Sequence, residues 1–314
     1  MNPSDMPKLS VVMSVYNGER YLDECMQSIL QQSFTNFEFI VINDGSTDNS
    51  LEILKRYQNS DSRICIINQS NAGLSTSLNR GIAIAKGTFI ARMDADDISY
   101  PTRFEEQVKL LEHDSECVIC GTQADIMDKK GDIIYSTNLE TNWEDIEKKL
   151  PSNPFVHFLT MFRNEPFYKA GGYNEKIKHH FEDVLLWNKM ALHGKLRNID
   201  SVLGAHRLDE HALTNRNKTA QNIMNKMIVN MLAKDEISLA DIALLKKITK
   251  NRPLYWKKSN YYLKVGRAHM DYSLSRKKAF LNLLMSLIWK PYNIYAIFNI
   301  FMLILPTSLI YRWK

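Results

Sequence analysis

The sequence lacks the short motifs that mark several large classes of nucleotide-binding protein. No G-x-G-x-x-G follows the first predicted strand, and no Walker A motif occurs in the 314 residues, which argues against dinucleotide oxidoreductases and P-loop kinases. Glycine is sparse as well, with 12 residues in the whole chain. A phosphate group bound by this protein is therefore expected to be held by a metal ion rather than by a glycine-rich loop.

Cysteine is equally scarce. The chain has 4 cysteines, and no second pair completes a zinc-binding spacing beside Cys117-x-x-Cys120. On a strand these two side chains face opposite sides, which is poor geometry for a redox pair. We therefore expect all four cysteines to be reduced residues of the core.

The first ten residues lack the basic start and apolar stretch of a secretory signal. We therefore expect the protein on the cytoplasmic side of the cell membrane. With 45% hydrophobic and 24% charged residues, the composition is that of a globular chain. Its length predicts one large core plus a smaller helical appendage.

Positive charge is in slight excess, with 40 Lys and Arg against 35 Asp and Glu. The excess grows from Lys246 to Lys314, which indicates an acidic partner for the C-terminal part. Because the basic residues there alternate with apolar ones, a phospholipid surface fits better than nucleic acid.

From Leu9 onward, short β-rich runs alternate with helical patterns, which is typical of a sheet wound with crossover helices. The predicted strands are Leu9–Val15, Phe37–Ile42, Ile64–Ile67, Thr88–Met93 and Val118–Met127. Lys130 and Gly131 predict a hairpin turn, and a further extended segment is expected to run to about Arg207. Beyond Asn215 the pattern is helical only.

The densest acidic cluster, Asp94-Ala95-Asp96-Asp97, directly follows the strand Thr88–Met93. Open α/β sheets bind ligands beyond the carboxyl ends of their strands. Neighbouring carboxylates repel one another unless a cation lies among them, and hard divalent ions take oxygen ligands while bridging to phosphates. The cluster therefore predicts Mn²⁺ or Mg²⁺ on Asp94 and Asp96, together with a diphosphate. A solvated acidic turn is the alternative; an EF-hand loop is rejected because Ser99 replaces its obligatory glycine.

Two further positions suggest nucleotide contacts. Asp44 follows the second strand, and helix capping by Thr47 or Asp48 leaves its carboxylate unexplained, so it can accept from a base N–H. Tyr16 at the tip of the first strand offers a ring for stacking on a nucleobase, although simple packing is the commoner role of such a residue.

Glu182 and Asp183 begin a predicted helix. Acidic residues are common in the first helical turn, so the pair alone has a bland explanation. The helix N-terminus nevertheless stabilises an ionised carboxylate, which can then take a proton. Asp183 is therefore the candidate general base.

These clusters, together with SVVMSVYNGERYL (Ser10–Leu22), VINDGSTDNS (Val41–Ser50) and FEDVLLWNKM (Phe181–Met190), resemble the family 2 glycosyltransferases over roughly Lys8 to Thr214. The resemblance implies a GT-A fold, which is a mostly parallel mixed sheet flanked by helices with a D-x-D motif. It also implies inverting, metal-dependent transfer of a single hexose or N-acetylhexosamine from a nucleoside-diphospho-sugar, with a UDP-sugar expected.

By the same resemblance, the acceptor is a hydroxyl of a lipid-linked (polyprenyl-diphosphate) glycan in O-antigen, capsule or similar surface-polysaccharide assembly. A protein or soluble acceptor is the alternative. A processive synthase would carry several membrane helices and a Q-x-x-R-W motif, which we do not find, and a nucleotidyltransferase would carry a basic glycine-rich loop after the first strand.

Residue roles carry over from the family's motifs. The donor-binding residues would be Ser14, Tyr16, Asp44, Asn79, Gly81, Arg92 and Asp94, and the acceptor-binding residues His157, Arg163, Gly172, Tyr173 and Glu182. Many members have Arg where this chain has Leu78, so a diphosphate contact is expected from Arg80 or Arg92. Many also have His where this chain has Asp209, which leaves His206 or His211 as possible contacts of the metal or diphosphate.

We expect the catalytic domain to span residues 1–215, with the donor half at about 1–100 and the acceptor half at about 101–215, followed by a helical appendage at 216–280. Pro291–Tyr311 then has 21 residues without a charge, and a spanning helix needs about 20. Because Asn293 and Pro306 interrupt this run, we expect residues 281–314 to lie at the membrane interface. Packing on the catalytic domain or a homodimer contact is the alternative.

Overall fold

The computed structural model describes residues 6–177, 181–209, 218–234, 238–248, 252–272 and 274–304. The chain forms two compact units. The first comprises Met1–Ala124, Thr137–His206 and Arg216–Thr249, and the second comprises Asp125–Ser136, Arg207–Asn215 and Lys250–Lys314. The domain boundaries expected at 215 and 280 stay a prediction.

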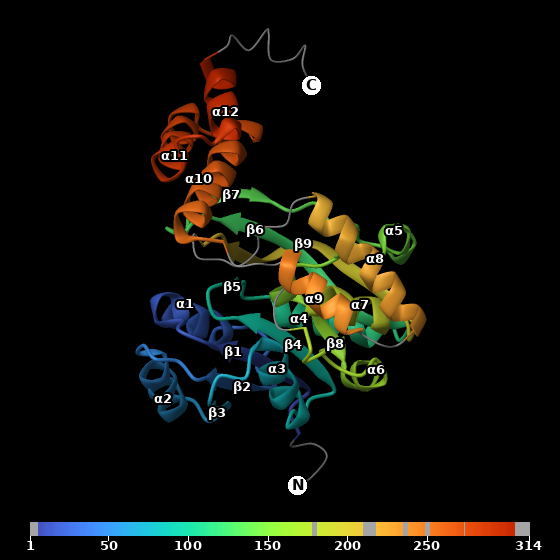
Figure 1. Cartoon of the computed structure of the whole chain (residues 1–314). Helices are drawn as coiled ribbons and strands as arrows, with labels where there is room; N and C mark the ends of the chain where they lie inside the picture. The colour runs from blue at the N-terminus through green and yellow to red at the C-terminus, as the bar shows by residue number, and fades with distance from the viewer. Residues whose placement is uncertain are drawn as a thin grey trace. The chain divides into compact units, whose positions relative to one another are not determined.

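Four parallel strands form one half of the sheet in the first unit, in the order β3-β2-β1-β4. These strands are β1 (Leu9–Val15), β2 (Phe37–Asp44), β3 (Ile64–Gln69) and β4 (Phe89–Asp94). The helices between them are α1 (Glu19–Leu30), α2 (Ser50–Ser60) and α3 (Leu74–Ala83). The predicted alternation is confirmed (Figure 1). Because the strands are parallel, their carboxyl ends meet at one edge of the sheet.

Antiparallel strands extend the sheet beyond β4. The order continues β4-β8-β6-β9-β5, with β8 antiparallel to both β4 and β6. The added elements are β5 (Ile98–Ser99), α4 (Arg103–His113), β6 (Cys117–Met127), β8 (Met161–Arg163) and β9 (Lys195–Arg207). The predicted strand Val118–Met127 is thereby confirmed as β6, and the predicted extended segment to about Arg207 is confirmed as β9.

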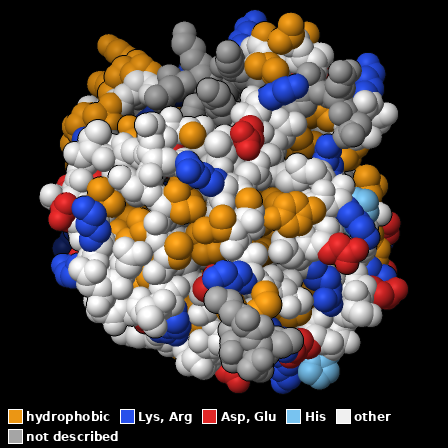
Figure 2. Space-filling view, turned by 90° about the horizontal axis from the view of Figure 1, so that it is seen from below, with side chains coloured by type: hydrophobic (Ala, Val, Ile, Leu, Met, Phe, Trp, Pro, Cys, Tyr) orange, Lys and Arg blue, Asp and Glu red, His pale blue; other side chains and the backbone are white. Residues whose placement is uncertain are grey.

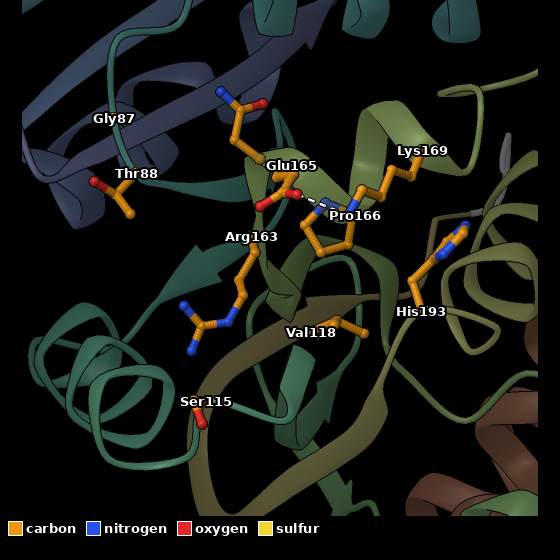
Figure 3. A pocket seen from close by; sticks show the side chains of 10 residues that line it. Gly87, Thr88, Ser115, Val118, Arg163, Glu165, Pro166, Lys169 and His193 are labelled. Carbon is orange, nitrogen blue, oxygen red and sulfur yellow. Dashed lines mark ion pairs between the residues drawn. The ribbon is translucent and has the colours of Figure 1, made fainter.

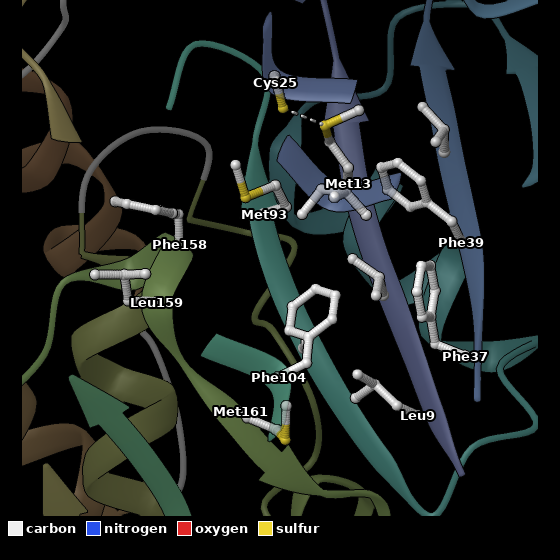
Figure 4. Close-up of a cluster of buried hydrophobic side chains, with 14 of the residues drawn as sticks. Leu9, Met13, Cys25, Phe37, Phe39, Met93, Phe104, Phe158, Leu159 and Met161 are labelled. Atoms are coloured by element: carbon white, nitrogen blue, oxygen red, sulfur yellow. Dashed lines mark hydrogen bonds between the residues drawn. The ribbon is translucent and has the colours of Figure 1, made fainter. Parts of the chain in front are cut away.

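Alternate side chains of the central strands feed two hydrophobic cores. One face carries Leu9, Met13 and Met93, which pack with Phe104 of α4 (Figure 4). On the other face, Val12 and Ile90 belong to a second core. This division follows from the two-residue period of a strand. Cys25, Cys117 and Cys120 are free and buried as expected, whereas Cys65 is exposed, so its expected place in the core is wrong.

Shorter elements complete the first unit. They are α5 (Trp143–Lys149), the 3₁₀ helix η2 (His157–Leu159), α6 (Asn164–Lys169), α7 (Glu182–Met190), α8 (Lys218–Lys234) and α9 (Leu239–Ile248). The apolar face of α7 packs on α8 in a third core that includes Val184 and Ile228. This packing fixes the helix that begins with Glu182.

The second unit joins a hairpin to a helical segment. β7 (Ile133–Ser136) pairs with the end of β6, and Gly131 has φ +90°, which confirms the predicted turn. The helices are α10 (Leu254–Asp271), α11 (Arg276–Trp289) and α12 (Ile294–Ile304). Among the described residues, no helix is long and apolar enough to cross a membrane. The last part of the uncharged run, from residue 305, lies outside the described residues.

Buried polar side chains hold α10, α11 and α12 together. Asn293 donates to Ser259 Oγ at 3.0 Å and to Ser286 Oγ at 3.1 Å. Ser286 in turn donates to the carbonyl of Ser259 at 2.8 Å. These bonds place Asn293 at the bend between α11 and α12, so the uncharged stretch does not continue as one straight helix.

Candidate active site

The carboxyl ends of β1 and β4 bring predicted donor-binding residues together. Ser14 is in register with Asp94 on one side and with Ile42 on the other. Tyr16 follows directly on β1, and 55% of its surface is exposed. A planar ligand can therefore reach the Tyr16 ring beside the Asp94 carboxylate.

Asp44 is buried at the same edge and organises the loop before α3. Its Oδ1 accepts from Gln69 Nε2 and from the amide of Ala72, both at 2.8 Å. Its Oδ2 accepts from the amide of Gly73 at 3.0 Å. Gly73 has φ +91°, a conformation that favours glycine. Asp44 thus shapes the predicted base pocket, and any base N–H shares its oxygens with these donors.

The acidic cluster after β4 has two paired carboxylates. Arg92 Nη1 lies 2.6 Å from Asp94 Oδ1, and His206 Nδ1 lies 3.1 Å from both oxygens of Asp97. Partial burial alone would lower the pKa of His206, but the carboxylates of Asp97, Asp96 and Asp94 together outweigh it and raise that pKa, which favours the imidazolium. His206, one of the two histidines expected near the metal or diphosphate, therefore lies beside the acidic cluster. His211, the other, lies outside the described residues.

Asp96 shows the electrostatic strain expected at a cation site. Burial raises the pKa of its carboxyl group, and the charges of Asp97 and Asp94 raise it further. A bound divalent ion would remove this penalty, and carboxylate oxygens are the ligands that Mg²⁺ and Mn²⁺ prefer. The described residues contain no cluster of three or more such ligands around one point. The charge and donor type therefore fit a metal whose ligand shell is completed by other groups.

Asp183 lies in the first turn of α7 and is only 6% exposed. Its Oδ2 accepts from Asn153 Nδ2 at 3.1 Å. Phe181, two residues before Asp183, has φ +83°. This backbone conformation is rare for a residue with a bulky side chain and is found most often at functional sites. The local backbone thus presents an oriented, helix-stabilised carboxylate.

His157, which is partly buried, and the buried Tyr173 form a pair that packs on α7. His157 Nε2 and the Tyr173 hydroxyl are 2.9 Å apart, and both rings pack against Trp187. Burial and the charge of Arg92 lower the pKa of His157 well below its usual value, so its imidazole is neutral. Burial also raises the pKa of Tyr173. The charge of Arg92 opposes this rise, and the charges of Asp183 and Glu182 add to it. These residues are brought together at the predicted acceptor side.

Arg163 is not brought together with them. It pairs in register with Phe89, at the opposite end of β4 from Asp94. Its guanidinium donates to the carbonyls of Cys117 at 2.9 Å and Asp114 at 3.1 Å. The structure thus corrects the expected acceptor contact, because the antiparallel direction of β8 carries this side chain to the far edge of the sheet.

A cavity of about 460 Å³ opens at that far edge (Figure 3). Its lining comes from the turn before β4, the start of β6, α6 and the end of α7. The residues are Gly87, Thr88, Ser115, Val118, Arg163, Asn164, Glu165, Pro166, Lys169 and His193. None of the predicted donor-binding residues lines it.

Asn79 and Gly81 make packing contacts in the structure, and their expected place in the donor pocket stays a prediction. Asn79 Nδ2 donates to the carbonyl of Tyr173 at 2.8 Å, and its Oδ1 accepts from the amide of Tyr173 at 3.0 Å. A Cβ on Gly81 would lie 2.6 Å from Ile42 and 2.7 Å from Val12. Gly172, at φ +68°, forms the turn that Asn79 clamps. These residues hold Tyr173 in place and let α3 approach the sheet.

The comparisons with known proteins agree with this geometry. The sequence model of glycosyl transferase family 2 matches residues 10–185. The chain belongs to this family. An uncharacterized glycosyltransferase of Haemophilus influenzae is 32% identical over 291 residues, which cover 86% of this chain and 87% of the relative. A chondroitin synthase of Pasteurella multocida is 27% identical over 63% of this chain, but over 20% of its own length.

Solved structures show the same fold as this family 2 glycosyltransferase. S. aureus TarS 1-349 in complex with UDP-GlcNAc has a TM-score of 0.57 at 16% identity, covering 94% of this chain and 90% of that one. The mannosyltransferase PcManGT from Pyrobaculum calidifontis, in complex with GDP-Man and Mn²⁺, has a TM-score of 0.54 at 16% identity, covering 95% and 84%. The mixed sheet with flanking helices is therefore the expected GT-A-type fold.

Two residues of this family 2 glycosyltransferase were missed by the sequence analysis. Asn153 contacts the candidate base, but nothing in its neighbourhood in the sequence points to Asp183. Arg103 of α4 is fully buried and donates to the carbonyl of Arg92 at 2.8 Å, and its burial lowers its pKa to about 9. The run from Thr102 to Glu112 is amphipathic, and an arginine on its apolar face was the available signal for Arg103.

Proposed function

We propose that this glycosyltransferase moves a single hexose or N-acetylhexosamine, with inversion, from a UDP-sugar to a hydroxyl of a lipid-linked glycan. The product would enter O-antigen, capsule or similar surface-polysaccharide assembly. One observation carries the proposal: Asp94 stands at the carboxyl end of β4 in register with Ser14 of β1, with Asp96 two residues further on, at the sheet edge where such folds bind ligands.

Divalent metal dependence belongs to the same proposal. Asp96 and Asp94 would hold Mn²⁺ or Mg²⁺ at the carboxyl end of β4. When bound, such an ion neutralises charge on the departing diphosphate. The raised pKa of Asp96 supports this assignment, since burial and two neighbouring carboxylates make a cation favourable there.

The protein's own groups supply the remaining chemistry. Asp183 accepts the proton of the attacking hydroxyl, and a positioned base of this kind contributes about 10² to 10⁴ in rate. Asn153 orients the Asp183 carboxylate through its amide. The aromatic packing around Tyr173 and Trp187 excludes water from the floor of the site. Tyr16 and Asp44 hold the nucleobase at the far side of the acidic cluster.

Membrane contact would bring the enzyme to a lipid-linked acceptor. Apolar side chains of α11, α12 and the bend between them are exposed: Leu281, Leu284, Ile288, Tyr292, Ile294, Tyr295, Ile297, Phe298 and Phe301. Lys277 and Lys290 flank this set, which we call the apolar hairpin face. Aromatic and basic side chains together suit the headgroup layer of a bilayer. A peripheral or monotopic position on the cytoplasmic side of the cell membrane follows.

Apolar exposure is not confined to that face. The space-filling view in Figure 2 also shows apolar side chains among Lys and Arg side chains on the surface. Ile84, Tyr168 and Leu192 of the first unit are also exposed. The apolar hairpin face differs from these isolated residues because its members lie on consecutive turns of α11 and α12 and at the bend between them.

The proposed chemistry is tested with purified protein, Mn²⁺ and a panel of UDP-, GDP- and dTDP-sugars. The wild type is expected to hydrolyse at least one UDP-sugar. Asp183→Asn should bind that donor with unchanged affinity but lose at least about 10²-fold in transfer, as expected for a general base. Normal turnover by Asp183→Asn would refute its role.

The chondroitin synthase relative favours polymerisation as a second candidate. Product length separates the two functions. One added sugar per acceptor supports single transfer, and a ladder of products supports a synthase. The proposed acceptor would be contradicted if a soluble oligosaccharide or a protein accepted the sugar at the same rate as the lipid-linked glycan.

A further inference from the structure

Arg92 is a buried cation in contact with a residue assigned to the donor. It lies on β4 two positions before Asp94, so both side chains project from the same face of the strand. Only 2% of Arg92 is exposed. Its Nη1 contacts Asp94 at 2.6 Å and also donates to the carbonyl of Met93. The guanidinium is therefore anchored through a single nitrogen.

The other two nitrogens of Arg92 are not used in this way. Nε and Nη2 are buried and make no hydrogen bond in the part of the chain that the structure describes. Such desolvation is unfavourable for a charged donor. Burial alone would lower the pKa of Arg92, but Asp94, Tyr173 and Glu182 outweigh it and raise that pKa. The ion pair with Asp94, rather than a full set of hydrogen bonds, holds the guanidinium in place.

We propose that Arg92 is a positioning residue that fixes the Asp94 carboxylate for the donor. This inference rests on the proposed function, because it takes Asp94 as a donor contact. The Asp94 side chain is 32% exposed, so it can meet a ligand while it stays on Arg92. Since only Nη1 makes hydrogen bonds, a lysine ammonium can replace the contact and an apolar side chain cannot.

A double-mutant cycle tests the inference. The probe is the UDP-sugar that the wild type hydrolyses fastest, titrated in the presence of Mn²⁺. Arg92→Met is expected to weaken binding about tenfold in the wild-type background but no more than about twofold in Asp94→Asn, because its effect passes through the Asp94 carboxylate. Arg92→Lys is expected to stay within about threefold of wild type, since it keeps the charge.

A loss of about tenfold from Arg92→Met in the Asp94→Asn background as well would overturn the inference and leave the transferase assignment standing. Where Arg92→Met fails to fold by circular dichroism, Arg92→Lys carries the test, and a loss above about tenfold in folded protein overturns the inference. If the wild type hydrolyses no UDP-sugar, the proposed donor fails and this inference fails with it.

Arg63 and Asp61 provide a matched control, because they form an ion pair at 2.7 Å outside the candidate site. Arg63→Met and Asp61→Asn, singly and together, are expected to leave the affinity for the UDP-sugar unchanged. A loss equal to that of the Arg92 cycle would show that the effect is a general loss of stability, and would overturn the positioning role.

Discussion

Asp183 owes its position as candidate base to local features that act on one carboxylate. The first turn of α7 stabilises its charge, Asn153 donates to one of its oxygens at 3.1 Å, and the core around Val184 fixes the helix. An acidic residue at the start of a predicted helix, together with the family's motif, predicted Asp183 as the base. The orientation of its carboxylate depends on Asn153, which is 30 positions away in the sequence.

Asn153→Ala removes the amide that holds the Asp183 carboxylate. A hydrogen bond to a charged group contributes about 1.5–3 kcal/mol, so kcat is expected to fall by about 10- to 100-fold while KM for the donor is unchanged. Steady-state kinetics with the UDP-sugar measures both constants.

Asn142→Ala is the control for this change. Asn142 caps α5 by accepting from the amide of Asp145 at 2.9 Å, without contact to Asp183. Its loss is expected to cost about 1 kcal/mol of stability and to leave kcat as in the wild type. Equal kcat values for both variants would contradict the orienting role of Asn153.

Secondary-structure elements show how far the sequence alone carries the fold. The strands from β1 to β4 were predictable because their apolar runs are continuous and turn residues separate them. The short elements β8, α5 and α6 were not predicted, because three to seven residues give too little periodicity to recognise.

Strand direction explains which site residues could be assigned from motifs. Residues at the carboxyl ends of parallel strands, such as Tyr16, Asp44 and Asp94, meet at one edge by construction. Arg163 lies on an antiparallel strand that the sequence did not reveal, so its motif position gave no information about the edge it occupies. Gly81 and Asn79 likewise follow a motif, and their contacts with Val12 and Tyr173 were not visible in the sequence.

The whole molecule combines a catalytic unit with a second unit rich in exposed apolar surface. Each unit has its own core, and the second carries the apolar hairpin face on α11 and α12. Mean composition hides this difference, since the 45% hydrophobic and 24% charged residues are those of an ordinary globular chain. Membrane attachment is therefore a prediction for the whole protein.

Tyr295→Ser, Phe298→Ser and Phe301→Ser, combined in the full chain, test that attachment. These side chains are 63%, 60% and 59% exposed, and burying one such side chain in lipid is worth about 1.5–3 kcal/mol. The triple variant is expected to bind vesicles of phosphatidylcholine and phosphatidylglycerol at least about tenfold more weakly in a sedimentation assay.

Leu192→Ser controls for the loss of exposed apolar surface in general, because Leu192 is 70% exposed in the first unit. It is expected to bind the vesicles as the wild type does. Unchanged vesicle binding by the triple variant would contradict membrane attachment through α12, and a dimer that dissociates in this variant would instead make the face a contact between two copies.

The central claim is that carboxylates at the end of β4 bind a diphosphate through a divalent ion, and calorimetric titration of UDP tests it most directly. The wild type is expected to bind UDP at least about tenfold more tightly with Mn²⁺ than with EDTA, a difference of about 1.4 kcal/mol. In Asp96→Asn this gain should disappear. A wild type that binds UDP equally well in EDTA, or an Asp96→Asn variant that keeps the full gain, would contradict the claim.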